Sequence, residues 1–180
     1  DESGDSDPGP TPEQAAAADP NAADFPAVGG RSLKELARQA SAGLNYAPAT
    51  ATYSPGSNRV AFGLLDQRNE IVYAPTALYL ARTPTSPARG PFLAPSDSLI
   101  TEPAYQSKAA ALEQDPFASI YSADVDFPAA GDWTGLVLSD TGEGLLGATA
   151  SYRVSEKGTV PEVGEPAPVT RCVRVAGLTS

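Results

Sequence analysis

In this chain of 180 residues, the carboxylates are the side chains best able to take part in catalysis or metal binding. Asp124 and Asp126 are two positions apart in a predicted strand, which places both on its polar face, and Asp132 and Asp140 lie in adjacent turns. Clustered carboxylates can bind calcium or act as acid and base in a hydrolase. Two acids at this spacing are also usual on the solvated face of a strand, and no EF-hand-like loop is present. We therefore predict no catalytic residue and no metal site.

Histidine is absent from the sequence. This removes the commonest general base and metal ligand at neutral pH, and it excludes serine–histidine and cysteine–histidine catalysis within the chain. Cys172 is the only thiol, so the chain has neither a dithiol redox pair nor a cysteine-based zinc site. Arg171 and Arg174 would favour its thiolate form, and the alternative is an incidental cysteine in a tail. We expect no enzymatic activity and no bound cofactor.

Two further patterns have both a binding and a structural interpretation. Gly142-Glu143-Gly144 is glycine-rich, but it lacks the Lys and Ser/Thr of a phosphate-binding loop and is predicted to be a turn. Five tyrosines could form an aromatic binding surface: Tyr46, Tyr53, Tyr73, Tyr79 and Tyr105. The competing interpretation is packing, because a domain of this size needs most of its aromatic side chains in the core.

Residues 120–138 are the clearest strand-forming stretch. Apolar and polar side chains alternate as far as Phe127, which is the pattern of a strand with one buried face. Residues 128–132 then interrupt the strand with a proline and a glycine, and a second apolar run covers 133–138. We expect two strands joined by a tight turn, with Trp133 in or near the core.

The rest of the central region favours short strands over helices. Strands are predicted at 46–53, 59–65, 70–73, 77–81 and 145–154, of which 46–53 is an irregular edge strand and 70–73 the hairpin partner of 59–65. The proline-rich residues 83–98 are predicted to be a long loop, and 102–115 a loop or a short helix around 108–113. About seven short strands with no alternating helices indicate an all-β, immunoglobulin-like β-sandwich.

One helix is predicted, over residues 31–44. Ser32 followed by Glu35 fits a capping box, apolar residues recur on one face, and Gly43 suits the C-terminal stop. A helix of this length is not stable alone, so we expect it to pack on the domain. The alternative is an amphipathic helix that binds a partner.

Charge and composition divide the chain into three parts. Residues 1–30 are predicted to be an acidic, Pro/Ala-rich flexible tether, 31–156 the helix and sandwich, and 157–180 a linker or tail. Seven acids and no Lys or Arg lie in residues 1–24. The chain has a net charge of −10, and the residues after 24 contribute only −3 of it. Neither residues 1–24 nor the rest of the chain offers the basic patch that nucleic acid would need.

Nothing in the sequence is long and apolar enough to span a membrane. The chain starts at Asp1 and contains no Met, so we expect that an upstream piece was removed. An acidic, solvated N-terminal segment is typical of exported bacterial proteins and of lipoproteins with a lipid anchor upstream. The predicted location is therefore extracytoplasmic, and the alternative is a chain cut at a convenient place.

Residues 121–133 resemble the closing strands of bacterial extracytoplasmic immunoglobulin-like domains, in which an alternating strand is followed by Pro-x-x-Gly-x-Trp. Residues 163–168 (Val-Gly-Glu-Pro-Ala-Pro) are similar to the lead-in of redoxin domains. Together with 59–65 and 88–92, they make most of residues 24–168 resemble the N-terminal part of actinobacterial thioredoxin-domain lipoproteins. No Cys-x-x-Cys follows, so the resemblance implies no redox residue in this chain.

These observations lead to two main functional hypotheses. The first is a non-enzymatic extracytoplasmic interaction module that recognises a protein partner through edge strands and the loop at 83–98. The alternative is an accessory domain of a thioredoxin-like thiol-disulfide oxidoreductase, whose catalytic domain is absent from this chain and would be its C-terminal partner. A third, weaker hypothesis is carbohydrate or calcium binding through the loops.

Overall fold

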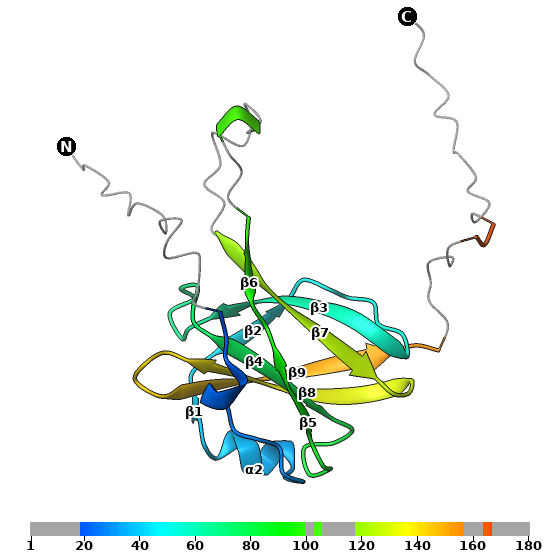
Figure 1. The fold of residues 1–180 in the computed structure, drawn as a ribbon, viewed down its shortest axis with the longest axis horizontal. Coiled ribbons are helices and arrows are strands. Elements are labelled where there is room, and N and C mark those ends of the chain that lie inside the picture. The colour runs from blue at the N-terminus through cyan, green and yellow to red at the C-terminus, as the bar shows by residue number, and fades with distance from the viewer. Residues whose placement is uncertain (1–18, 100–102, 106–117, 157–163, 167–180) are drawn as a thin grey trace, which may run out of the picture.

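The computed structural model describes residues 19–99, 103–105, 118–156 and 164–166. Within these ranges the chain forms a β-sandwich of two packed sheets with one short α-helix (Figure 1). This confirms the predicted all-β sandwich. The predictions for residues 1–18, for a helix around 108–113 and for Cys172 fall outside the described residues.

The strands follow the order of an immunoglobulin-type domain. They are β1 (Ser41–Ala42), β2 (Asn45–Pro48), β3 (Gly56–Leu65), β4 (Thr76–Ala81), β5 (Arg89–Leu93), β6 (Ser96–Ser98), β7 (Ser119–Phe127), β8 (Gly131–Asp140) and β9 (Leu145–Val154). The first sheet has the order β1-β9-β8-β4-β5 and the second β2-β3-β7-β6. In immunoglobulin nomenclature, β2-β3-β7-β6 correspond to strands A-B-E-D, and β5-β4-β8-β9 to C′-C-F-G.

The strands predicted at residues 120–138 are present, but they belong to different sheets. β7 pairs with β3 and β6, whereas β8 pairs with β4 and β9. The turn at 128–130 therefore carries the chain from one sheet to the other. Trp133 at the start of β8 is only 5% exposed, which confirms its predicted place in the core. Its indole N–H donates to the carbonyl of Ala129 at 2.9 Å and closes the corner.

Three predictions about strands and loops are corrected. The predicted loop at 83–98 is shorter, because only residues 83–88 precede β5 and β6, which occupy most of the rest of the range. Proline is tolerated there since Pro91 lies in an edge strand, where one side needs no ladder N–H. Residues 70–73 form no strand and contribute only an isolated bridge between Ile71 and Leu65. The edge strand predicted at 46–53 ends at Pro48.

The predicted N-terminal helix is present but shorter. α2 covers Leu33–Ala37, and its capping box between Ser32 and Glu35 is confirmed. The chain leaves the helix early because β1 pairs in parallel with the start of β9. Two short 3₁₀ helices, η1 (Ala22–Asp24) and η2 (Pro103–Tyr105), complete the described helices.

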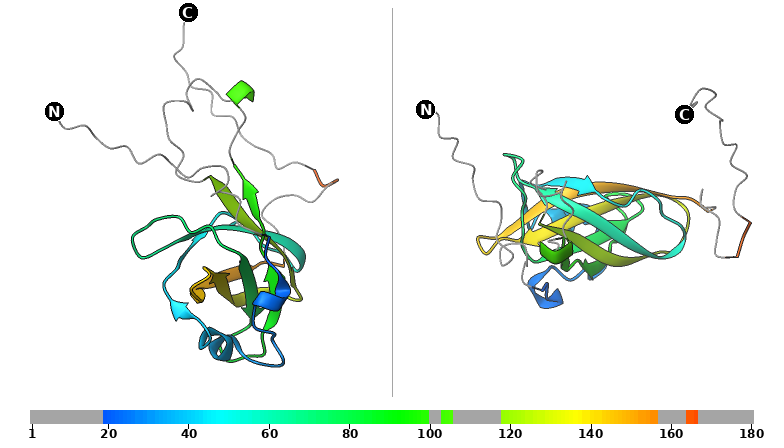
Figure 2. Two further views of the ribbon diagram at one scale, coloured as in Figure 1. Left: turned by 60° about the vertical axis from the view of Figure 1, so that its left-hand side comes forward. Right: turned by 90° about the horizontal axis from the view of Figure 1, so that it is seen from above.

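The sandwich has two apolar clusters. The main core lies between the sheets, and a second cluster lies on the outer face of the first sheet. There Phe25, Leu33 and Leu36 of residues 22–40, which we call the strap, cover side chains of β4 and β8. Figure 2 shows the backbone of the strap, in blue, on the outside of the sandwich. The covered side chains are Ala77, Tyr79, Ala81, Leu136 and Leu138. The helix thus docks on its own domain, as predicted. The prediction of a flexible tether that extends to residue 30 is wrong at Phe25, because this side chain is buried.

Candidate functional site

The connections between strands place several loops at the same end of the sandwich. Residues 66–75 join β3 to β4, and 141–144 join β8 to β9. Leu99 and Ala118, which follow β6 and precede β7, are linked by a backbone hydrogen bond of 2.8 Å at this end. We call these residues the loop end. Its position follows from the antiparallel pairing of β3 with β7 and of β4 with β8.

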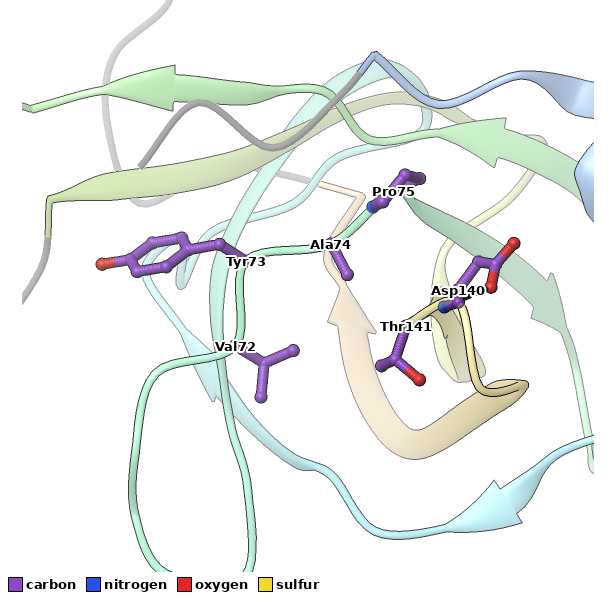
Figure 3. A pocket seen from close by; sticks show the side chains of 7 residues that line it. Val72, Tyr73, Ala74, Pro75, Asp140 and Thr141 are labelled. Atoms are coloured by element: carbon purple, nitrogen blue, oxygen red, sulfur yellow. Dashed lines mark hydrogen bonds between the residues drawn. The ribbon is translucent and has the colours of Figure 1, made fainter. Parts of the chain in front are cut away.

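A hollow of about 430 Å³ lies between the two loops of this end. It is lined by Val72, Tyr73, Ala74, Pro75, Asp140, Thr141 and Gly142. Figure 3 shows the side chains of Val72, Ala74 and Thr141 converging, while the Tyr73 ring and the Asp140 carboxylate point away from them. The lining of the hollow is therefore polar and apolar in about equal parts, and the Asp140 carboxylate is not directed into it.

A buried tyrosine holds one wall of the hollow in place. The hydroxyl oxygen of Tyr121, in β7, accepts the N–H of Ala74 at 2.7 Å. Its proton lies within reach of the carbonyl oxygens of Val72 (2.9 Å) and Ala74 (3.0 Å). Burial raises the pKa of Tyr121, so the hydroxyl remains protonated and able to donate at neutral pH. Tyr73 adds a second link, because its hydroxyl oxygen accepts the N–H of Ala118 at 2.9 Å.

A pair of hydroxyls supports the hollow from below. Thr76 and Ser139, opposite each other on β4 and β8, are fully buried with their oxygens 2.6 Å apart. Thr76 donates its proton to the carbonyl of Ala74 at 2.8 Å, so Ser139 donates to Thr76. The N–H of Asp140 also donates to the carbonyl of Pro75 at 2.9 Å. Both walls are therefore tied to the centre of the first sheet.

The rim of the loop end is charged and internally ordered. Arg68 forms ion pairs with Asp66 (3.4 Å) and Glu70 (3.3 Å). The backbone N–H groups of Glu70 and Arg68 donate to Asp66, and they hold the pKa of that carboxyl below its usual range. In the opposite loop, the carboxylate of Asp140 accepts the N–H of Gly142 at 2.9 Å. The predicted turn at 142–144 is confirmed, with positive φ at Gly142.

The four aspartates singled out in the sequence are not brought together. Asp124 and Asp126 are exposed on the second sheet, as expected for a solvated face, and Asp126 pairs with Arg89 at 3.3 Å. Asp132 pairs with Arg153 at 3.5 Å at the end of the sandwich opposite Asp140. Among the described residues, no group of three or more His, Cys, Asp or Glu side chains is placed so that it could hold a metal ion.

The tyrosines mostly pack in the interior. Tyr53 lies edge-on to Phe127 and Tyr152, with ring centroids 5.7 and 5.3 Å away. Burial raises the pKa of Tyr53 and of Tyr79 to about 12. Tyr105 differs, because it is 78% exposed. The packing interpretation is therefore confirmed for the two buried tyrosines, Tyr53 and Tyr79.

The edge strands offer little to a partner that would add a strand. β1 has two residues and β6 has three. β2 ends on Pro48, and β5 contains Pro91 beside a register shift in its pairing with β4. Short edges interrupted by proline discourage strand addition. The short edges therefore lend no support to the expected binding at edge strands, and binding at residues 83–98 stays a prediction.

No protein-family model, curated protein or solved structure matches this chain. The redoxin-like segment at 163–168 has only residues 164–166 within the described ranges. Within those ranges, no helix has the length and apolar character needed to cross a membrane. The resemblance to thioredoxin-domain lipoproteins therefore remains a prediction from the sequence.

Proposed function

We propose that this protein is a non-enzymatic interaction module that acts outside the cytoplasm and recognises a protein partner at its loop end. The observation that carries the proposal is the hollow between residues 66–75 and 141–144, with walls held by Tyr121 and by the Thr76–Ser139 pair. A surface ordered before binding loses less conformational entropy when a partner docks.

The other surfaces are less suited to a partner. The strap already occupies the outer face of the first sheet. The second sheet presents polar side chains outward, among them Arg59, Asp124 and Asp126, and two of these are paired within the domain. Since the edge strands are short, the loop end is the surface that combines apolar contact area with ordered backbone.

The nature of the partner follows from the lining of the hollow. The converging side chains of Val72, Ala74 and Thr141 are small, and the lining as a whole is polar and apolar in about equal parts. Because the hollow is wide open to solvent, it fits one or two side chains of a polypeptide better than a small molecule, which pockets normally enclose. A protein partner is therefore the class that we propose.

Site-specific photocrosslinking in the producing cell tests this proposal. A photoreactive residue at Thr141 should give a discrete adduct, whereas one at Ser57, exposed at the far end of β3, should not. Val72→Asp should abolish the Thr141 adduct, because it places a charge in the hollow. Equal adducts at both positions, or an adduct that survives Val72→Asp, would contradict the loop end as the site. Protease accessibility in intact and permeabilised cells tests the extracytoplasmic location separately.

The alternative is an accessory domain of a thioredoxin-like thiol-disulfide oxidoreductase. Its support is the Val-Gly-Glu-Pro-Ala-Pro segment at 163–168. The gene sequence beyond Ser180 tests it directly. A Cys-x-x-Cys within the next several tens of codons would support the alternative, and an immediate stop codon would count against it.

A further inference from the structure

Negative charge gathers around the hollow of the loop end. Four carboxylates lie on its two loops or directly before them, those of Asp66, Glu70, Asp140 and Glu143. The one cation among them is the guanidinium of Arg68, so four acids against one base leave a net charge of −3. The other described residues of the loop end carry no charged side chain. The entrance to the hollow is therefore acidic.

The strands of the sandwich balance their charges differently. Three ion pairs on the sheets each join one arginine to one aspartate: Arg59–Asp97 (3.9 Å), Arg89–Asp126 (3.3 Å) and Arg153–Asp132 (3.5 Å). At the loop end, in contrast, the single guanidinium of Arg68 is shared between Asp66 and Glu70. It therefore leaves no cation of that end for Asp140 or Glu143.

Asp140 and Glu143 are the carboxylates of the loop end that can meet a partner. Within the described part of the chain, neither forms an ion pair, and Asp140 accepts only the N–H of Gly142 (2.9 Å). Glu143 is exposed in the turn between β8 and β9. Asp140 lines the hollow, and its carboxylate points away from the converging side chains (Figure 3). Its charge thus lies at the rim, beside the place where a partner's side chain enters.

We propose that the segment recognised at the loop end is cationic, with lysine or arginine side chains flanking the small side chain that enters the hollow. This inference rests on the proposed function and names the chemistry of the partner. The inserted side chain contacts Val72 and Ala74, and the flanking cations meet Asp140 and Glu143. Exposed ion pairs add little affinity each, so the rim acts by selecting the partner and speeding the encounter. An acidic segment is rejected, because its carboxylates would face those of the rim.

Photocrosslinking at Thr141 in the producing cell tests the charge of the partner. Asp140→Asn/Glu143→Gln should lower the yield of the adduct at least about threefold. The asparagine keeps an oxygen that can accept the Gly142 N–H, so the turn is preserved. Asp124→Asn/Asp126→Asn removes two exposed charges from the second sheet and should leave the yield unchanged.

The outcomes separate this inference from the proposed function. An undiminished adduct in Asp140→Asn/Glu143→Gln would overturn the cationic partner and leave the loop end as the binding site. A wild-type chain without any adduct at Thr141 would refute the proposed function, and this inference with it.

Nuclear magnetic resonance on the purified full chain tests the same point with defined probes. Two synthetic peptides of equal length serve, one with a valine between two lysines and the other with a valine between two glutamates. The lysine peptide should shift the amide signals of Ala74 and Gly142, and the shifts should shrink at about 1 M salt, where the Debye length is about 3 Å. The glutamate peptide should leave both signals in place. Equal shifts with the two peptides, or none with the lysine peptide, would overturn the proposal.

Discussion

The hydroxyl of Tyr121 in β7 is bonded to the backbone of Ala74, the residue that leads into β4, with the N–H at 2.7 Å and the carbonyl oxygen at 3.0 Å. A side chain of one sheet thus fixes the entry of the chain into the other sheet. This contact spans 47 residues of sequence and lies directly behind the hollow of the loop end.

Tyr121→Phe should therefore lower the free energy of unfolding by about 1–3 kcal/mol, because it leaves the buried N–H of Ala74 without its acceptor. Urea denaturation followed by tryptophan fluorescence measures the change. Tyr46→Phe is the comparison, since the Tyr46 hydroxyl bonds no backbone group that leads into a strand, accepts a longer bond from Tyr152 (3.2 Å) and belongs to a partly exposed residue. A loss for Tyr46→Phe as large as that for Tyr121→Phe would contradict the role of the Ala74 contact.

Trp133→Phe should lower the free energy of unfolding by about 1–3 kcal/mol. The substitution removes the indole N–H that donates to Ala129 and reduces the ring over which Arg82 lies, 4.3 Å from the centroid. Arg82→Gln removes the cation over the ring and leaves the hydrogen bond between Trp133 and Ala129, so it should lower the free energy of unfolding by about 0.5–1 kcal/mol. Calorimetric melting of the two variants separates the contributions. An Arg82→Gln loss as large as the Trp133→Phe loss would mean that the hydrogen bond at the corner contributes little.

The stability of the domain should fall on the acid side. The N–H and hydroxyl of Ser32 lower the pKa of Glu35, and backbone N–H groups lower that of Asp66. Because both pKa values are below those of the unfolded chain, the unfolded state binds more protons, and stability is lost as the pH falls from about 5 through the lower folded-state values. Glu35→Gln with Asp66→Asn should flatten this limb of a melting temperature–pH profile, whereas Lys34→Gln, which removes no carboxyl group, should not. An unchanged slope in the double variant would refute the assignment.

Tyr79 reports the state of the strap through its ionisation. Burial raises its pKa to about 12, so the unfolded chain releases this proton first and stability is lost as the pH rises above about 10. In Phe25→Asp/Leu36→Asp, the uncovered hydroxyl should titrate closer to 10. Ultraviolet titration of tyrosine absorbance measures this, with Tyr79→Phe identifying the signal. A curve identical to that of wild type would show that the strap does not shield Tyr79.

Local patterns predicted those elements whose burial is periodic. The alternation along residues 120–127 identified β7 because one of its faces lies against the core, and Ser32 with Glu35 identified the start of α2. β5 was missed because Pro91 signals a loop, and only its place at a sheet edge makes the proline acceptable. The helix was predicted too long, since the pairing of β1 with β9 is a contact distant in sequence.

The candidate site was not foreseeable for a related reason. Val72, Ala74 and Tyr121 are ordinary core-type residues in the sequence, and what sets them apart is a contact between loops that the sheet topology brings together. The aspartates drew attention because of their charge, and the strands then distributed them over opposite faces and ends. The dipeptide Tyr73-Ala74 just before the apolar run of β4 was the nearest local signal, and it carries no chemical signature of its own.

The parallel pairing of β1 with β9 has a mechanical consequence. Ser41 and Ala42 pair with the start of β9, Tyr53 bridges to Val154 at its end, and the Ser155 N–H donates to the Tyr53 carbonyl at 3.0 Å. Tension applied between the two ends of the chain would pull these parallel segments past each other along their length. The hydrogen bonds would then bear the load together in shear instead of opening one after another, so the pairing acts as a clamp against stretching.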